Sequence, residues 1–178
     1  MGKSVMLHTI IRGLLPIAEL VLIDPKQVEF QDYRRLKNAT VVTDKNDAIA
    51  HLETVRKRME SRLRRMARKR ARDVSQIGRQ RIAVVIDELA SLTLYSTKAR
   101  DLLIQLAEKG RVAGIHLITA TQTPKANVTS TNFRNNCGIR IAFSVPDYTA
   151  SRVILGRTGA QYLTAPGDGL VLNGNTLT

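Results

Sequence analysis

The sequence contains no tryptophan, a single cysteine and few aromatic residues, so its hydrophobic core must consist mainly of aliphatic side chains. The one cysteine, Cys137, excludes an internal disulfide and fits a reducing compartment. Three scattered histidines and one cysteine give no zinc-site spacing. No stretch approaches the roughly 20 apolar residues of a membrane helix, and no signal peptide is visible. We expect a cytoplasmic chain without membrane contact of its own, although a longer parent protein could be anchored elsewhere.

Acidic residues are also scarce, because 15 Asp and Glu stand against 28 Lys and Arg, for a formal net charge of +13. The excess is concentrated in residues 56–72, where ten Lys or Arg accompany one acid, Glu60, and give +9 of the +13. A charge run is usually a solvated helix face, but this density exceeds what solubility requires. The expected partner is a polyanion, either nucleic acid or another acidic molecule.

The segment Arg81–Ala90, RIAVVIDELA, organises the rest of the chain. Residues 82–86 are all apolar and mostly β-branched, which predicts a buried strand of a parallel sheet. Asp87 and Glu88 follow at the end of this strand, where open α/β sheets bind ligands. This is the form of a Walker B element, in which the Asp holds a nucleotide's Mg²⁺ and the Glu activates water. A strand that runs into an acidic turn explains the same residues equally well.

Gly2, Lys3 and Ser4 form the second half of a P-loop, in which the Lys reaches the β- and γ-phosphates and the hydroxyl ligates Mg²⁺. The tripeptide alone is common by chance. Apolar residues recur after it with helical spacing as far as Pro16, and a helix beginning at Gly-Lys-Ser is the context that a P-loop needs. The sequence starts inside the motif, so we expect that codons upstream of Met1 encode the missing strand and glycine-rich turn.

Strands and helices are expected to alternate along the remaining chain. Strands are predicted at residues 19–24, 41–43, 115–121, 138–145 and 169–172. Helices are predicted from the N-cap Asp44 to about residue 72, at 98–110 with Gly110 as the C′ residue, and at 147–155. Residues 91–96 are expected to form a connection and 124–136 a loop or short helix. This alternation predicts one α/β domain over residues 1–178, with a mostly parallel sheet flanked by helices.

Six stretches together resemble one protein family, in matching order and at compatible spacing. They are IDPKQVEF (23–30), VVTD (41–44), VVIDELA (84–90), GRVAGIHLITATQTP (110–124), SRVILGRTGAQYL (151–163) and GDG (167–169). The chain resembles the motor domain of FtsK/SpoIIIE DNA translocases over nearly its whole length. The resemblance implies a RecA-like P-loop NTPase core whose first strand and glycine-rich loop are missing here. It also implies ATP and Mg²⁺ as cofactors, a homohexameric ring and double-stranded DNA as partner.

The resemblance assigns the nucleotide site to the two Walker elements. Gly2, Lys3 and Ser4 match the end of Walker A and are expected to bind ATP. Asp87 and Glu88 match Walker B, so the Mg²⁺ is expected on Ser4 and Asp87, and the attacking water on Glu88.

Three further residues receive roles from the resemblance. Gln122 matches a γ-phosphate sensor, although an ordinary amide at the end of a strand is the simpler explanation. Arg152 matches an arginine that completes a neighbouring subunit's site, where such a group is worth about 10³ to 10⁵ in rate. Arg62 is a second candidate for that role. The simpler explanations are a surface salt bridge for Arg152 and a solvated helix position for Arg62. The family's Arg after ATQ is replaced by Thr123, and its acid after DELA by Ser91.

Two other functions stay open at this point. A conjugative coupling or secretion-type ATPase with a similar motor domain would move single-stranded DNA or protein, and the positive charge favours nucleic acid. A catalytically inactive DNA-binding fragment is the third possibility, because the missing loop would supply several backbone N–H donors to the phosphates. We expect weak or absent hydrolysis from the isolated 178 residues and an ATPase in the parent protein.

Overall fold

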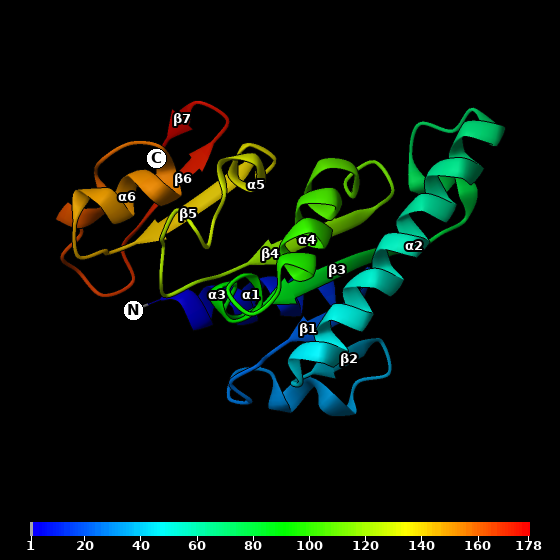
Figure 1. The fold of residues 1–178 in the computed structure, drawn as a ribbon, viewed down its shortest axis with the longest axis horizontal. Helices are drawn as coiled ribbons and strands as arrows, with labels where there is room; N and C mark the ends of the chain where they lie inside the picture. Colours follow the sequence, from blue (N-terminus) through cyan, green and yellow to red (C-terminus); the bar gives the residue numbers. More distant parts are fainter. Residues whose placement is uncertain (1) are drawn as a thin grey trace.

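A parallel sheet forms the centre of the computed structural model, which describes residues 2–178 (Figure 1). Its strands run in the order β2–β1–β3–β4. They comprise β1 (Ala18–Ile23), β2 (Ala39–Val42), β3 (Arg81–Ile86) and β4 (Ile115–Thr119). The register pairs Ala18 with Arg81 and Ile23 with Ile86, so β1 and β3 end level with each other. The predicted α/β class and mostly parallel central sheet are confirmed.

Strand β3 is apolar without interruption because helices cover both faces of the sheet. Successive side chains of a strand point to opposite faces. Ile82, Val84 and Ile86 therefore lie in a core shared with helices α2 and α4, whereas Ala83 and Val85 lie in a core shared with helix α1. All five of these side chains are fully buried.

Three long helices cover the sheet, namely α1 (Lys3–Leu14), α2 (Lys45–Lys69) and α4 (Thr97–Lys109). The predicted N-cap is confirmed, since the Asp44 side chain accepts from the N–H groups of Asn46 and Asp47 at 2.8 and 3.0 Å. The prediction of a C′ glycine after α4 is wrong, because Gly110 has a right-handed φ of −61°. The close approach of the neighbouring backbone requires glycine here instead, because an added Cβ would lie 2.3 Å from the Leu106 carbonyl oxygen.

The C-terminal strands form a second sheet, which the sequence did not predict. Strands β5 (Ile139–Phe143), β6 (Gly169–Asn173) and β7 (Thr176–Leu177) pair antiparallel in that order, with helix α6 (Tyr148–Leu155) packed against β5 (Figure 1). A small core of its own holds this unit together, comprising Ala142, Leu155, Ala160 and Leu172. Only Ala142 is fully buried within β5, as is typical of a strand with one covered face.

Short helices complete the fold. Helix α3 (Ala90–Thr93) lies in and before the predicted connection, and α5 (Thr131–Asn135) lies in the segment predicted as a loop or short helix. Single 3₁₀ turns occur at η1 (Gln31–Arg35), η2 (Val74–Ile77) and η3 (Ala160–Tyr162). Across residues 2–178, no helix combines the length and apolar character needed to cross a membrane.

Candidate functional site

The structure joins Lys3 to Asp87, 84 positions apart in the sequence, at the carboxyl end of β3. Lys3 Nζ forms an ion pair with Asp87 Oδ1 and donates to the Asp87 carbonyl oxygen at 2.9 Å. Asp87 is 1% exposed. Gly2, which precedes the helix, has a φ of 124°, and an added Cβ would lie 2.6 Å from the Phe143 ring. The backbone at this turn therefore requires glycine and directs Lys3 to the acidic end of the central strand.

The first turn of α1 is suited to bind an anion. The helix begins without a side-chain cap and without an acid in its first turn. The first N–H groups of any helix lack intrahelical partners and attract phosphate. Lys3 adds a cation at the same place, so the donors present fit the phosphates of a nucleotide.

Glu88 lies in a cluster built from the ends of three strands. It is 4% exposed, and it accepts from the Thr121 hydroxyl at 2.5 Å and from the backbone N–H of Gln122 at 3.0 Å. Lys26, in the loop after β1, places its Nζ 3.6 Å from Glu88 Oε2 and 3.4 Å from the Gln122 side-chain oxygen. The structure thus brings the backbone N–H of Gln122 to Glu88 and adds Lys26, which sequence reasoning missed. The signal for Lys26 was its position just after a buried strand that ends in an acid.

The hydroxyl of Ser4 has a partner that sequence reasoning also missed. Ser4 Oγ donates to Glu29 Oε1 at 2.6 Å, across 25 positions of sequence. Within residues 2–178, no group of three or more His, Cys, Asp or Glu could hold a metal ion by themselves. Mg²⁺ commonly uses one or two carboxylates and completes its shell with phosphate oxygens and water. The oxygens of Ser4 and Asp87 fit a metal that arrives with a nucleotide.

Arg62 is held inside the chain. It is 7% exposed, and its terminal nitrogens donate to the carbonyl oxygens of Ala113 at 2.9 Å and Gln80 at 2.8 Å. Burial, aided by the neighbouring Arg58, lowers the pKa of the Arg62 guanidinium from its usual value. A solvated helix position is therefore the wrong description of Arg62, and its placement gives no support to a role in a neighbouring subunit's site.

Arg152 lies on α6, which packs against β5 of the second sheet. It is exposed on α6, where its guanidinium lies 5.9 Å from the centre of the Tyr148 ring. The simpler explanation for Arg152, a surface salt bridge, is not supported, because Arg152 forms no ion pair with any of the described residues, 2–178. Its side chain is exposed and so is accessible to another molecule.

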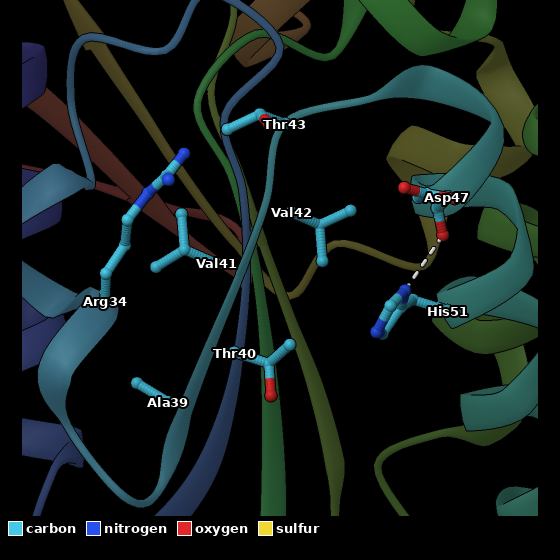
Figure 2. Close-up of a pocket in the computed structure, with 8 residues that line it drawn as sticks. All are labelled: Arg34, Ala39, Thr40, Val41, Val42, Thr43, Asp47 and His51. Atoms are coloured by element: carbon cyan, nitrogen blue, oxygen red, sulfur yellow. Dashed lines mark hydrogen bonds between the residues drawn. The ribbon is translucent and has the colours of Figure 1, made fainter.

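An open pocket of about 460 Å³ lies along β2, one of the two outer strands of the parallel sheet, and Figure 2 shows the residues that line it. It is lined by Arg34, Ala39, Thr40, Val41, Val42, Thr43, Asp47 and His51. The His51 ring nitrogen that faces the Asp47 carbonyl oxygen in this view lies 2.9 Å from it, one helical turn away. None of the predicted site residues lines this pocket, so the nucleotide site is to be sought at Lys3 and Asp87.

The fold is similar to those of solved ATPase structures. The pCW3 conjugation coupling protein TcpA, solved in a monomer form with ATPγS, matches with a TM-score of 0.92 and 27% identity, over 98% of this chain and 55% of that one. The cytoplasmic domain of the type VII secretion ATPase EccC from Thermomonospora curvata matches with a TM-score of 0.81 and 20% identity, over 99% of this chain and 23% of that one. The EccC match shows a common fold alone.

Curated relatives share more of the sequence. The chain is 36% identical to the DNA translocase SftA of Bacillus subtilis over 96% of its own length, and 35% identical to a DNA translocase FtsK of Helicobacter pylori over 94%. It spans only 20% and 22% of those two proteins. The FtsK/SpoIIIE family model matches residues 1–83 and 75–126, which include both Walker elements and Gln122. The resemblance inferred from the motifs is confirmed, and the chain belongs to the FtsK/SpoIIIE family.

Proposed function

We propose that residues 1–178 form the ATPase domain of a DNA translocase motor, which hydrolyses ATP and moves DNA. The contact between Lys3 and Asp87 carries the proposal, because it joins the two halves of a nucleotide site that lie 84 positions apart. The family relationship supports it, since the matched relatives from B. subtilis and H. pylori are DNA translocases. ATP and DNA both occur in the cytosol, which is the location that we propose.

The residues at the site divide the work of binding and hydrolysis. Lys3 and the free N–H groups of α1 hold the phosphates, with Gly2 allowing the turn that precedes them. Ser4 and Asp87 would hold Mg²⁺, which would neutralise charge on the phosphates. Binding requires that Lys3 exchange the Asp87 carboxylate for phosphate oxygens.

Glu88 and Gln122 act on the attacking water and the γ-phosphate. Glu88 accepts hydrogen bonds from the Thr121 hydroxyl and the Gln122 backbone N–H and lies 3.6 Å from the Lys26 ammonium, so its carboxylate is oriented to accept a proton from water. The backbone N–H of Gln122 donates to the Glu88 carboxylate. A contact between the Gln122 side chain and the γ-phosphate can therefore change the position of Glu88.

Ring assembly and DNA contact complete the proposed motor. Arg152 is exposed and supplies the arginine that enters the site of the next subunit in a homohexamer. The end of α2 offers exposed cations to the phosphates of double-stranded DNA, namely Arg64, Arg65, Arg68, Lys69, Arg70 and Arg72. Phosphate contacts of this kind make DNA binding strongly dependent on salt and weakly dependent on sequence.

A second candidate is a conjugative coupling ATPase that moves single-stranded DNA. The TM-score of 0.92 with the coupling protein TcpA favours it. Affinities for single- and double-stranded DNA of equal length, measured at the same salt concentration, separate the two candidates. A preference for single strands would replace double-stranded DNA as the proposed cargo.

The ATPase rate of the chain with and without double-stranded DNA tests the proposal, with Glu88→Gln as control. For the parent protein that contains this chain we expect DNA-stimulated hydrolysis that Glu88→Gln abolishes, and for the isolated 178 residues we expect weak or absent hydrolysis. Binding of a fluorescent ATP analogue to the wild-type chain and to Lys3→Ala tests the site separately from hydrolysis. A chain that binds DNA and no nucleotide would be a DNA-binding protein without an ATPase, and the proposal would be wrong.

A further inference from the structure

The hydroxyl of Ser4 has a defined acceptor, the carboxylate of Glu29. The hydrogen bond from Ser4 Oγ to Glu29 Oε1 measures 2.6 Å, and both residues are half-buried. Ser4 lies in the first turn of α1, and Glu29 lies in the loop between β1 and η1. Asp87, to which a nucleotide's metal would also bind, is occupied by Lys3. Glu29 therefore faces a residue of the nucleotide site and takes no part in the functions assigned above.

The loop that carries Glu29 is fixed by its own contacts. Asp24 is fully buried, and its Oδ2 accepts from the backbone N–H groups of Glu29 at 2.9 Å and Phe30 at 3.1 Å. Phe30 is also fully buried and anchors the end of the loop in the core beside α1. Gln27 has a φ of 60°, a conformation that costs free energy in a residue other than glycine. The contacts of Asp24 and Phe30 therefore hold the loop in one conformation, and this conformation sets the position of Glu29 beside α1.

The second carboxylate oxygen of Glu29 lies near another side chain of α1, that of His8. His8 Nε2 lies 3.5 Å from Glu29 Oε2, and His8 Nδ1 lies 2.7 Å from the Tyr33 hydroxyl. The rings of His8 and Tyr33 stack with their centroids 5.6 Å apart. Ser4 and His8 are four residues apart, on one face of α1. The Glu29 carboxylate thus has a side chain of α1 beside each of its two oxygens, and the one from Ser4 is a hydrogen bond.

The direction of the Ser4 hydrogen bond decides what the hydroxyl can do. A serine hydroxyl has one proton to donate and two lone pairs. When the proton goes to Glu29, both lone pairs remain for a metal ion, and the rotation of the hydroxyl is fixed. Carboxylates that orient a metal ligand in this way typically contribute 10- to 100-fold in metal affinity or activity.

We propose that Glu29 is a positioning residue, which orients the Ser4 hydroxyl as a ligand of the nucleotide's Mg²⁺. The proposal rests on the proposed nucleotide site and names a residue that the Walker elements do not include. If Glu29 only fixed the loop to α1, its replacement would lower stability and leave metal affinity unchanged. The two roles therefore differ in a quantity that can be measured without hydrolysis.

The test uses Glu29→Gln, which keeps the size of the side chain and removes its charge. The probe is Mn²⁺ in place of Mg²⁺, with its affinity for the complex with ATPγS measured by electron paramagnetic resonance. We expect about a 10-fold loss of Mn²⁺ affinity. Nucleotide affinity in EDTA should stay within about 2-fold of the wild type. Asp32→Asn is the matched control, because Asp32 is an exposed acid three positions away, and it should leave both affinities unchanged.

Two further variants keep the proposal open to refutation. Glu29→Asp retains the charge but withdraws the carboxylate from Ser4, and it should lose as much Mn²⁺ affinity as Glu29→Gln. In a Ser4→Ala background, Glu29→Gln should cause no additional loss, because Glu29 acts through the hydroxyl. Unchanged Mn²⁺ affinity in Glu29→Gln and Glu29→Asp, or an equal further loss without Ser4, would overturn the proposal. A wild-type chain that binds no nucleotide would instead overturn the nucleotide site itself.

Discussion

Replacing Arg62 by alanine tests whether this residue stabilises the fold or acts on a neighbouring subunit. The guanidinium joins α2 to the residues just before β3 and β4, through the carbonyl oxygens of Gln80 and Ala113. Removing it leaves the buried carbonyl oxygen of Ala113 and the partly buried carbonyl oxygen of Gln80 without these donors. Each such loss costs about 1–3 kcal/mol. Part of this sum is offset because the variant no longer has to bury the charged guanidinium. We expect Arg62→Ala to lower the free energy of unfolding by about 2–4 kcal/mol.

Urea unfolding followed by far-ultraviolet circular dichroism measures this loss, since the chain has no tryptophan to report by fluorescence. For a chain of this size, each kcal/mol corresponds to about 2–4 °C in Tm, so Tm should fall by about 4–16 °C. Arg65→Ala is the control, because it removes one positive charge from an exposed position on the same helix. It should change stability by less than about 0.5 kcal/mol.

The reasoning fails if Arg62→Ala is as stable as Arg65→Ala. If that equally stable variant also lost DNA-stimulated hydrolysis, Arg62 would regain its place as a candidate for the arginine that acts in a neighbouring subunit. A destabilised variant that hydrolyses ATP normally at low temperature would support a purely structural role.

Three other changes give expected outcomes. Lys3→Ala should weaken ATPγS binding at least about 10-fold, measured by fluorescence titration, because the only side-chain cation of the first turn of α1 is removed. Arg152→Ala should keep nucleotide affinity and lose at least about 100-fold in ATPase rate, with activity partly restored by mixing with Lys3→Ala if the arginine acts between subunits. Burial, with Arg81 and Arg111 nearby, holds the pKa of His116 below 6.5. The unfolded chain therefore takes up a proton first, stability falls as pH drops below about 6.5, and urea titrations of His116→Gln should show a smaller fall.

Sequence reasoning succeeded where one local pattern determines one structure. The apolar run before Asp87 could only be a strand covered on both faces, and the structure buries it between two cores. Asp44 before a long apolar stripe could only be an N-cap, and its side chain accepts two backbone hydrogen bonds. In both cases the information lies within a few neighbouring residues.

Reasoning from the sequence failed where a contact depends on how distant segments pack. Strands are predicted at 138–145 and 169–172 and occur at 139–143 and 169–173, but periodicity does not say which strand pairs with which, and the two belong to a separate antiparallel sheet. Glu29 lies 25 positions from Ser4, and no spacing rule joins an acid in a loop to a hydroxyl on a helix. Arg62 and Arg65 lie in the same basic stretch of sequence, which does not distinguish them. Arg62 is buried and Arg65 is exposed because of how α2 packs beside the segments that precede β3 and β4.

The basic run of residues 56–72 shows what this difference means for DNA binding. The sequence has nine net positive charges there, but in the structure several of these side chains are paired or buried and are not available to bind DNA phosphates. Arg58 forms a two-point ion pair with Glu19, at 2.6 Å in both contacts, and the Arg58 guanidinium holds the pKa of Glu19 below its usual value. Arg56 pairs with Glu60, and Arg62 is buried.

Seven exposed cations remain in the run, namely Lys57 and six that follow Leu63, and the six place the proposed contact with phosphates mainly on the last two turns of α2 and the residues that follow. If each of the seven neutralised one phosphate, the slope of log affinity against log salt would be about −6 from this run, whereas nine charges would give about −8. A measured slope near −8 would require cations from elsewhere on the chain. The structure therefore predicts which cations of this run contact DNA, and a salt titration of DNA affinity tests their number.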